Sequence, residues 1–243
     1  MSVLVRTLAL VGAVALLGVA AAAPAGARFQ EAPTVDIQSN PAGLAPDGSS
    51  MTLAVLASCA ERSTVVEAVV RVSQPSGSGQ ASFPLTCIGS MRPFSVTVPA
   101  STGVFQLASA QVTATVVVKR GKTARADDSE VLTVQPIVLV ELAETAQLQS
   151  GGAAVVMDVT VACPAGGNGV QSSLVVSQEG RSIGSGTYVP VCDGSRHTFT
   201  VLVVASQGLY HTGIAQALTF ANTEFGGEIF YGIDDDGALD IVS

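Results

Sequence analysis

An internal repeat limits what this chain can fold into more than any other feature of its sequence. When the second half is aligned with the first, Cys163 follows Cys59 by 163 − 59 = 104 residues, and Cys192 follows Cys87 by 192 − 87 = 105 residues. Solenoid repeats are only about 20–50 residues long, so a period of this length indicates a duplicated domain. The same shifts align further residues: Ser73-Gln74 with Ser177-Gln178, Phe94 with Phe199, Gly103 with Gly208, and Phe105 with Tyr210.

Each copy is rich in valine, threonine and serine and contains short runs in which apolar and polar residues alternate. Residues 52–57 and 94–98 show the period of two that is typical of a β-strand with one buried face. Seven short strands in about a hundred residues predict an all-β fold of two tandem immunoglobulin-like β-sandwich domains. In the first copy we expect strands at 33–38, 51–58, 65–73, 80–86, 93–98, 107–119 and 129–135. In the second we expect 137–142, 153–162, 170–178, 185–191, 197–204, 210–220 and a last strand within 227–242.

The N-terminal segment has the pattern of a secretory signal peptide. Arg6 supplies a positive charge, residues 7–23 form an apolar core, and Ala25-Gly26-Ala27 is a small-residue cleavage site. An uncleaved membrane anchor is the alternative. After cleavage, no apolar run is long enough to cross a bilayer. We therefore predict a protein that is secreted or associated with the cell envelope, with the following organisation: a signal peptide at 1–27, an immunoglobulin-like domain at 28–135, and a second one at 136–243 with an acidic C-terminal tail.

An even number of cysteines in an exported chain favours disulfides. Because the repeat places two cysteines at matching positions in each copy, the simplest pairing is Cys59 with Cys87 and Cys163 with Cys192. Each bridge would stabilise the fold by roughly 3–4 kcal/mol in the chain-entropy treatment. Free buried thiols are the alternative. The chain has no Trp, so it lacks the buried Trp that accompanies the inter-sheet bridge of antibody domains.

The charge of the chain excludes one class of partner. The formal net charge is −8, and it becomes 10 − 19 = −9 once Arg6 is removed with the signal peptide. An acidic surface repels the phosphate backbone, so we expect no binding to nucleic acid.

The residues offer little for catalysis. The two histidines, His197 and His211, could form a metal pair or a general base, but we favour polar surface positions on two strands as their explanation. A zinc site needs three or four ligands, and none remain once the cysteines are bridged. No serine lies in a nucleophile-elbow motif with matching partners. We therefore expect no enzyme activity, no cofactor and no metal, with one weak calcium candidate in the tail.

That candidate consists of Asp234, Asp236 and Asp240 around Gly237. Closely spaced aspartates before a glycine can wrap a hard cation such as calcium. Two positions of the calcium-loop pattern are occupied by Gly232 and Ser243, which offer no carboxylate. The alternative interpretation is an acidic turn before a last strand at 238–242.

Two further segments have alternative interpretations. Asp127-Asp128 and Glu130 follow the basic residues Lys119, Arg120, Lys122 and Arg125, and together they are typical of a polar hairpin loop or, alternatively, of a partner-binding loop. The aromatic cluster of Phe225, Phe230 and Tyr231 is typical of core or edge packing.

The start of the predicted mature chain has a familiar pattern in Ala32-Pro33-Thr34-Val35, Gly43-Leu44 and Asp47-Gly48. It resembles the first strands of secreted actinobacterial immunoglobulin-like domains, and the alanine-rich signal suits the same source. Neocarzinostatin-type apoproteins, which carry small chromophores, open similarly but differ in cysteine spacing. The whole chain is most similar to an uncharacterised family of secreted actinobacterial repeat proteins with one cysteine pair per domain. Neither resemblance implies catalytic residues.

From these features we predict a secreted or envelope-associated, non-catalytic binding or structural module, whose partner is an unidentified extracellular protein or cell-surface component. Duplication of a sandwich increases reach or valency, and unpaired edge strands offer a route to partner binding by strand addition. A small-ligand carrier with a cleft between domains is one alternative. An enzyme inhibitor that acts through an exposed loop is another.

Overall fold

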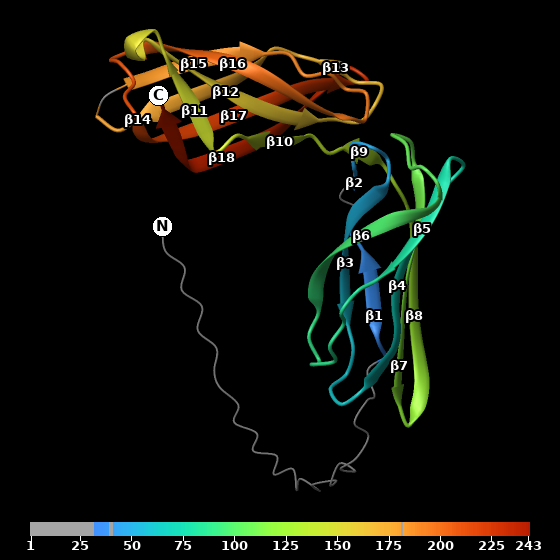
Figure 1. The fold of residues 1–243 in the computed structure, drawn as a ribbon. Helices are drawn as coiled ribbons and strands as arrows, with labels where there is room; N and C mark the ends of the chain where they lie inside the picture. Colours follow the sequence, from blue (N-terminus) through green and yellow to red (C-terminus); the bar gives the residue numbers. More distant parts are fainter. Residues whose placement is uncertain (1–31, 39–40, 181) are drawn as a thin grey trace, which may run out of the picture. The chain divides into compact units, whose positions relative to one another are not determined.

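The computed structural model describes residues 32–38, 41–180 and 182–243, without the side chains of Asp236 and Gly237. In this part of the chain every element is a β-strand except one 3-10 turn at Ser150–Gly152 (Figure 1). The all-β prediction is therefore confirmed. The described residues contain no helix that is long and apolar enough to cross a membrane. The predicted signal peptide at 1–27 lies outside them.

The described part of the first repeat contains nine strands. Within the sheet they follow the order β8-β7-β4-β5-β6-β3-β2-β9, while β1 pairs with β3. The pairs are antiparallel except β2 with β9, which is parallel. In chain order the strands are β1 (Thr34–Ile37), β2 (Ala42–Leu44), β3 (Ser50–Ser58), β4 (Thr64–Gln74), β5 (Gly77–Ser82), β6 (Arg92–Gly103), β7 (Ala110–Arg120), β8 (Lys122–Leu132) and β9 (Val134–Pro136).

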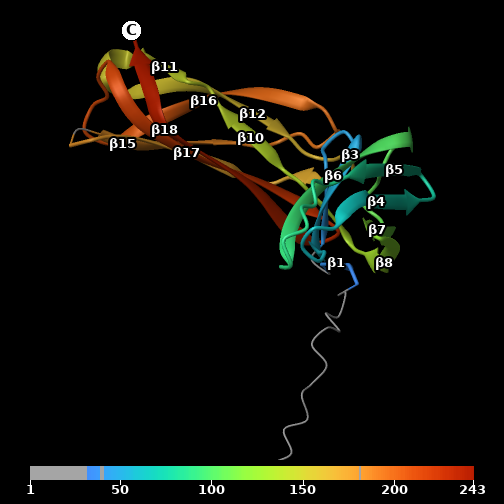
Figure 2. The same ribbon diagram turned by 90° about the horizontal axis from the view of Figure 1, so that it is seen from below.

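The second repeat also contains nine strands, in the order β10-β12-β11-β18-β17-β14-β15-β16, and β13 pairs with β17. Because β12 also pairs with β16, the pairings close on themselves. The long strands β17 and β18 run side by side in both views (Figures 1 and 2). In chain order the strands are β10 (Leu139–Leu142), β11 (Thr145–Gln149), β12 (Ala154–Ala162), β13 (Asn168–Gly169), β14 (Ser172–Gln178), β15 (Ser182–Tyr188), β16 (Arg196–Gln207), β17 (Gly213–Phe225) and β18 (Glu228–Val242).

The last strand of each copy differs from the sequence prediction. The sequence predicts a strand at 129–135 and a polar hairpin loop around its start that includes the acidic run of Asp127, Asp128 and Glu130. The loop assignment is wrong, because these residues lie inside β8 and pair with β7. The hairpin turns instead at Gly121, whose φ of +74° is a left-handed conformation that glycine adopts without a Cβ clash. The acidic turn expected before residue 238 is likewise wrong, since β18 runs through it.

Each repeat buries its own apolar cluster, and strand alternation explains which side chains contribute. In β3, for example, Met51, Leu53 and Val55 are buried while the residues between them are half-buried. The first cluster takes its members from Ile37 to Val134 and the second from Val138 to Ile241. Val55 and Val159, which are related by 159 − 55 = 104, are both fully buried, so these matching core positions serve the same packing role in the two copies.

The structure also locates the extra residue that changes the repeat shift from 104 to 105. In the first copy the β4–β5 hairpin closes with Gln74 opposite Gly77, so two residues form the turn. In the second copy Gln178 lies opposite Ser182, so three residues of sequence separate the paired ends. The insertion is therefore in the β14–β15 hairpin.

Candidate binding face of the second repeat

Three large apolar side chains point outward from β18. Ile229, Tyr231 and Ile233 are 54%, 65% and 52% exposed, respectively. They alternate with Gly232, which is buried, and with Asp234, which is half-buried. Because successive side chains of a strand point to opposite faces, the three lie on one side of the sheet. The expectation that Tyr231 packs in the core or at an edge is therefore wrong, although Phe225 and Phe230 do pack together with ring centroids 6.0 Å apart.

The neighbouring strands extend this apolar surface. Phe220 on β17 lies opposite Ile233, and both Phe220 and its neighbour on the same face, Leu218, are half-buried. Val175 on β14 lies opposite Leu218 and is also half-buried. We call these six side chains the apolar face: Val175, Leu218, Phe220, Ile229, Tyr231 and Ile233. Monomeric proteins seldom expose contiguous apolar surface of this kind unless it binds something.

The same positions in the first repeat are polar. Thr115 lies opposite Asp127 just as Phe220 lies opposite Ile233, and the two pairs are related by 220 − 115 = 105 and 233 − 127 = 106. By the same register, the counterpart of Tyr231 is Arg125. The remaining counterparts of the apolar face are Arg71 for Val175, Thr113 for Leu218, and Thr123 for Ile229.

These polar counterparts form a hydrogen-bonded network. Arg125 donates from Nε and one terminal nitrogen to Asp127 at 2.6 Å and 2.7 Å, and the Thr115 hydroxyl donates to the same carboxylate at 2.7 Å. These bonds lower the pKa of Asp127 from its ordinary 3.8 to about 2, the bond from Arg125 making the largest contribution. The first repeat thus has hydrogen-bonded polar and charged side chains on this face, whereas the second repeat leaves the face apolar.

The strands that carry the apolar face contain acidic residues but no basic ones. β14, β17 and β18 contain no lysine or arginine, whereas β17 and β18 contain six acidic residues, Glu224, Glu228, Asp234, Asp235, Asp236 and Asp240. Of these, Asp235 follows Ile233 on the outward side of β18, and Glu224 lies opposite Ile229. The apolar face is therefore edged by negative charge.

An open hollow of about 850 Å³ adjoins the apolar face. Ser177, Ile183 and Gln216 line it and form one row across β14, β15 and β17, next to the row of Val175 and Leu218. In the first repeat, pairing between β5 and β6 continues to Gly77 opposite Gly103. In the second, the β15–β16 pairing ends at Ile183 opposite Gln207. The hollow thus lies where the β15–β16 pairing stops one residue pair earlier than the β5–β6 pairing of the first repeat.

Both predicted disulfides are present. The S–S distances are 2.00 Å for Cys59–Cys87 and 1.99 Å for Cys163–Cys192. Each bridge connects the end of β3 or β12 to the loop that precedes β6 or β16. Beside each, a glycine N–H donates to the first cysteine's carbonyl, Gly89 to Cys59 at 3.0 Å and Gly194 to Cys163 at 3.1 Å. The bridges therefore hold two loops together at one end of each repeat.

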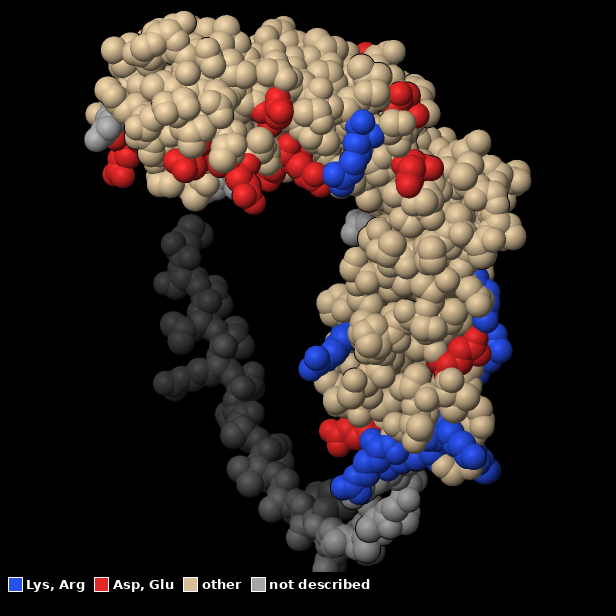
Figure 3. Space-filling view, in the orientation of Figure 1, with Lys and Arg blue, Asp and Glu red and all other residues tan. Residues whose placement is uncertain are grey.

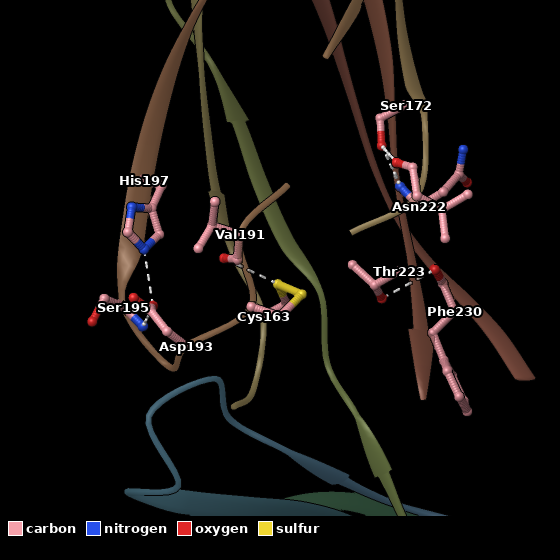
Figure 4. Close-up of a disulfide and its surroundings, with 11 residues drawn as sticks. Cys163, Ser172, Val191, Asp193, Ser195, His197, Asn222, Thr223 and Phe230 are labelled. Atoms are coloured by element: carbon pink, nitrogen blue, oxygen red, sulfur yellow. Dashed lines mark hydrogen bonds and ion pairs between the residues drawn. A yellow bond between two sulfur atoms is a disulfide. The ribbon is translucent and has the colours of Figure 1, made fainter. Parts of the chain in front are cut away.

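The two histidines have different surroundings in the structure. His197 lies near the start of β16, beside the loop that contains the second disulfide's Cys192, with its Nε2 2.9 Å from a carboxylate oxygen of Asp193 (Figure 4). The pKa of Asp193 is lowered, mainly by the bond with His197 and also by the Ser195 backbone N–H. Within the described residues the His197 ring bonds to the Asp193 carboxylate alone, so the pair ties the start of β16 to the loop before it. His211 is exposed, and only its backbone is held.

The described aspartates of the calcium candidate do not wrap around a point. Asp234 and Asp240 are six residues apart on the extended strand β18, roughly 20 Å at the rise of a β-strand. The Asp234 carboxylate accepts a bond from the Leu142 N–H at 2.8 Å, and Asp128 accepts one from the Ile37 N–H at 2.7 Å in the first repeat. Among the described residues, no group of three or more His, Cys, Asp or Glu could hold a metal ion.

The edge strands are poorly suited to strand addition. The first repeat has an edge at β8, whose outward side chains include Lys122, Arg125 and Asp127. Charges along an edge are a common defence against pairing with another chain. In the second repeat the closed pairing gives most strands two partners. We therefore place the candidate contact surface on a sheet face and not on an edge.

Comparison with known proteins adds little. No protein-family model matches the chain, and no curated protein matches it. Among solved structures, the chain is similar to a Ca²⁺-stabilised, ice-binding adhesin of an Antarctic bacterium, with 14% identity and a TM-score of 0.28 over 88% of this chain. It covers 49% of that structure, so the chain spans about half the adhesin's length. We draw no functional conclusion from this match.

Proposed function

We propose that this chain is a secreted or cell-envelope-associated, non-catalytic module that binds a protein partner through the apolar face of the second repeat. The observation that carries the proposal is the contrast between the two copies. Arg125 and Asp127 form an ion pair on the first repeat, and their counterparts Tyr231 and Ile233 are exposed apolar side chains. Exposing apolar area gains nothing in an isolated chain, and covering it is favourable by about 25 cal/mol per Å².

The compartment and the site chemistry support the same proposal. The two disulfides are consistent with an oxidising compartment outside the cytoplasm. The His197–Asp193 pair ties the start of β16 to the loop before it, and apart from the Tyr231 hydroxyl the apolar face consists of hydrocarbon side chains. Aromatic residues such as Tyr231 are common anchors of protein interfaces because they bury a large area with few rotatable bonds.

Site-specific photo-cross-linking in the producing host tests the proposal. A benzophenone amino acid replaces Tyr231 in one variant and Val204, 53% exposed on β16, in a control variant. We expect abundant adducts from position 231 and few from position 204. Equal, low yields at the two positions would show that the apolar face contacts nothing.

The hollow beside the apolar face favours a second candidate function, that of a small-ligand carrier. Its volume of about 850 Å³ is within the range of small-molecule sites, and its walls mix hydroxyl and amide groups with Ile183 and Ile214. Native mass spectrometry of protein from the producing host tests it. A reproducible extra mass that a Gln216→Trp substitution abolishes would support the carrier, and a bare chain would contradict it.

A further inference from the structure

A cluster of positively charged side chains lies at one end of the first repeat. Its β7–β8 hairpin, the β3–β4 loop and the start of β6 meet at one end, because Thr64 lies opposite Lys119 and Ala57 lies opposite Arg92. Five cations gather there, and Figure 3 shows the concentration of positive charge where β7 and β8 meet. We call this group the basic end: Arg62, Arg92, Lys119, Arg120 and Lys122.

The basic end also exposes apolar side chains. Val66 near the start of β4 is 61% exposed, and Met91 just before β6 is 50% exposed. Glu61 is the one acidic residue in the β3–β4 loop beside them. The basic end therefore combines exposed apolar groups with positive charge, while the apolar face combines exposed apolar groups with negative charge. The two surfaces are complementary in both respects.

The charges of the two repeats reinforce this complementarity. Residues 139–242 contain two arginines and eleven acidic residues, so their formal charge is 2 − 11 = −9. In the first repeat, Arg71 and Arg125 are in ion pairs with Glu67 and Asp127 away from the basic end. Among the described residues of the first repeat, the positive charge is thus concentrated at the basic end.

We propose that the occupant of the apolar face is a second copy of this chain, docked through its basic end. This inference rests on the proposed function, because it names the partner of the same face. A symmetric face-to-face dimer would bring Asp235 and Glu224 of both copies together, and like charges across an interface oppose association. A contact between two different surfaces leaves one of each surface free, so copies add head to tail into open chains.

Two full-chain variants separate this assembly from its alternatives. In the face variant, Tyr231→Arg with Ile233→Asp transfers the polar residues of the first repeat onto the second. In the end variant, Lys119→Glu with Lys122→Glu reverses charge on the β7–β8 hairpin. Val204→Asp is the matched control, because Val204 and Ile233 are 53% and 52% exposed. Circular dichroism and intact mass establish that each variant is folded and bridged.

Sedimentation velocity at low and high salt then gives the result. Wild type and the Val204→Asp control should form species larger than dimers that grow with concentration, and 1 M salt should shift the association at least tenfold toward monomer. Each of the two double variants alone should stay monomeric. Their equimolar mixture should form a dimer and no larger species, because only one intact face and one intact end remain to pair.

Other outcomes overturn the inference. An end variant that still dimerises as strongly as wild type would indicate face-to-face packing. A wild type that stays monomeric at the highest soluble concentration would exclude self-association. If the wild type stays monomeric, the photo-adducts at position 231 decide whether the proposed function stands. Adducts whose mass differs from that of two copies of this chain would retain the proposed binding face with another partner. The absence of adducts would remove the proposed function as well.

Discussion

The side chain of Gln178 holds both polar groups of the His211 backbone. Its Nε2 donates to the His211 carbonyl at 3.0 Å and its Oε1 accepts from the His211 N–H at 3.0 Å. Gln74 grips Gln106 in the same way in the first repeat, at 3.0 Å and 2.9 Å. Both glutamines are buried, which explains why the repeat retains them. Gln178 therefore fixes the backbone of His211, and the exposed ring takes no part in these bonds.

Replacing Gln178 should therefore destabilise the second repeat. Gln178→Ala removes the partners of the part-buried backbone N–H and C=O of His211, and a lost hydrogen bond of this kind costs about 1 kcal/mol. We expect the urea midpoint of unfolding to fall accordingly. Gln216→Ala is the control, because Gln216 is an exposed glutamine of the same repeat. If both variants unfold at the same urea concentration, the hydrogen bonds between Gln178 and the His211 backbone contribute nothing to stability.

Gly152 should tolerate no side chain. Its φ is +96°, and an added Cβ would lie 2.3 Å from the carbonyl oxygen of Tyr210. Gly151→Ala is the matched control, since Gly151 also has a positive φ of +65° but an added Cβ meets nothing within 4 Å. Left-handed backbone alone costs about 1–2 kcal/mol in an alanine. Thermal unfolding should show a clearly larger loss for Gly152→Ala, and similar losses for both would refute the close approach.

The Arg125–Asp127 pair should make the first repeat sensitive to acid. Because the folded state lowers the pKa of Asp127 from 3.8 to about 2, its contribution to stability is complete above pH 3.8 and is lost as the pH falls to about 2. The melting temperatures of wild type and Asp127→Asn should differ at pH 6 and converge near pH 2. In an Arg125→Ala background the same substitution should have a much smaller effect at pH 6, and an unchanged effect there would assign the shift to another group.

Asp234 should act as a backbone acceptor and not as a calcium ligand. Asp234→Ala leaves the Leu142 N–H without its partner and should lower the free energy of unfolding by about 1–2 kcal/mol. Asp234→Asn keeps an acceptor oxygen and should recover most of that loss. Chemical denaturation with excess calcium and with a chelator should give the same ranking. A stabilisation of wild type by calcium that both variants lose would restore the calcium interpretation.

Much of the fold follows from the sequence because its determinants are local or repeat at a fixed shift. Alternation in segments such as 51–58 predicts a strand with one buried face, and β3 has that pattern. The cysteine pairing follows from two copies with two cysteines each. Strand ends were harder: the charged segment 122–130 has the composition of a loop, yet pairing with β7 makes it a strand. Tertiary pairing overrode the local preference there.

The sequence by itself determined that this chain is a duplicated all-β protein with one disulfide per copy. Only the tertiary structure decided which apolar residues remain exposed. In Ile229-Phe230-Tyr231-Gly232-Ile233 both faces of the strand carry large apolar residues, so composition cannot tell the outward side from the inward one. The role of Asp234 was equally hidden, because its partner Leu142 lies 92 residues earlier in the chain. Such contacts depend on the register between strands that are distant in the sequence. A slip of one residue in that register would turn the outward side chains of a strand inward.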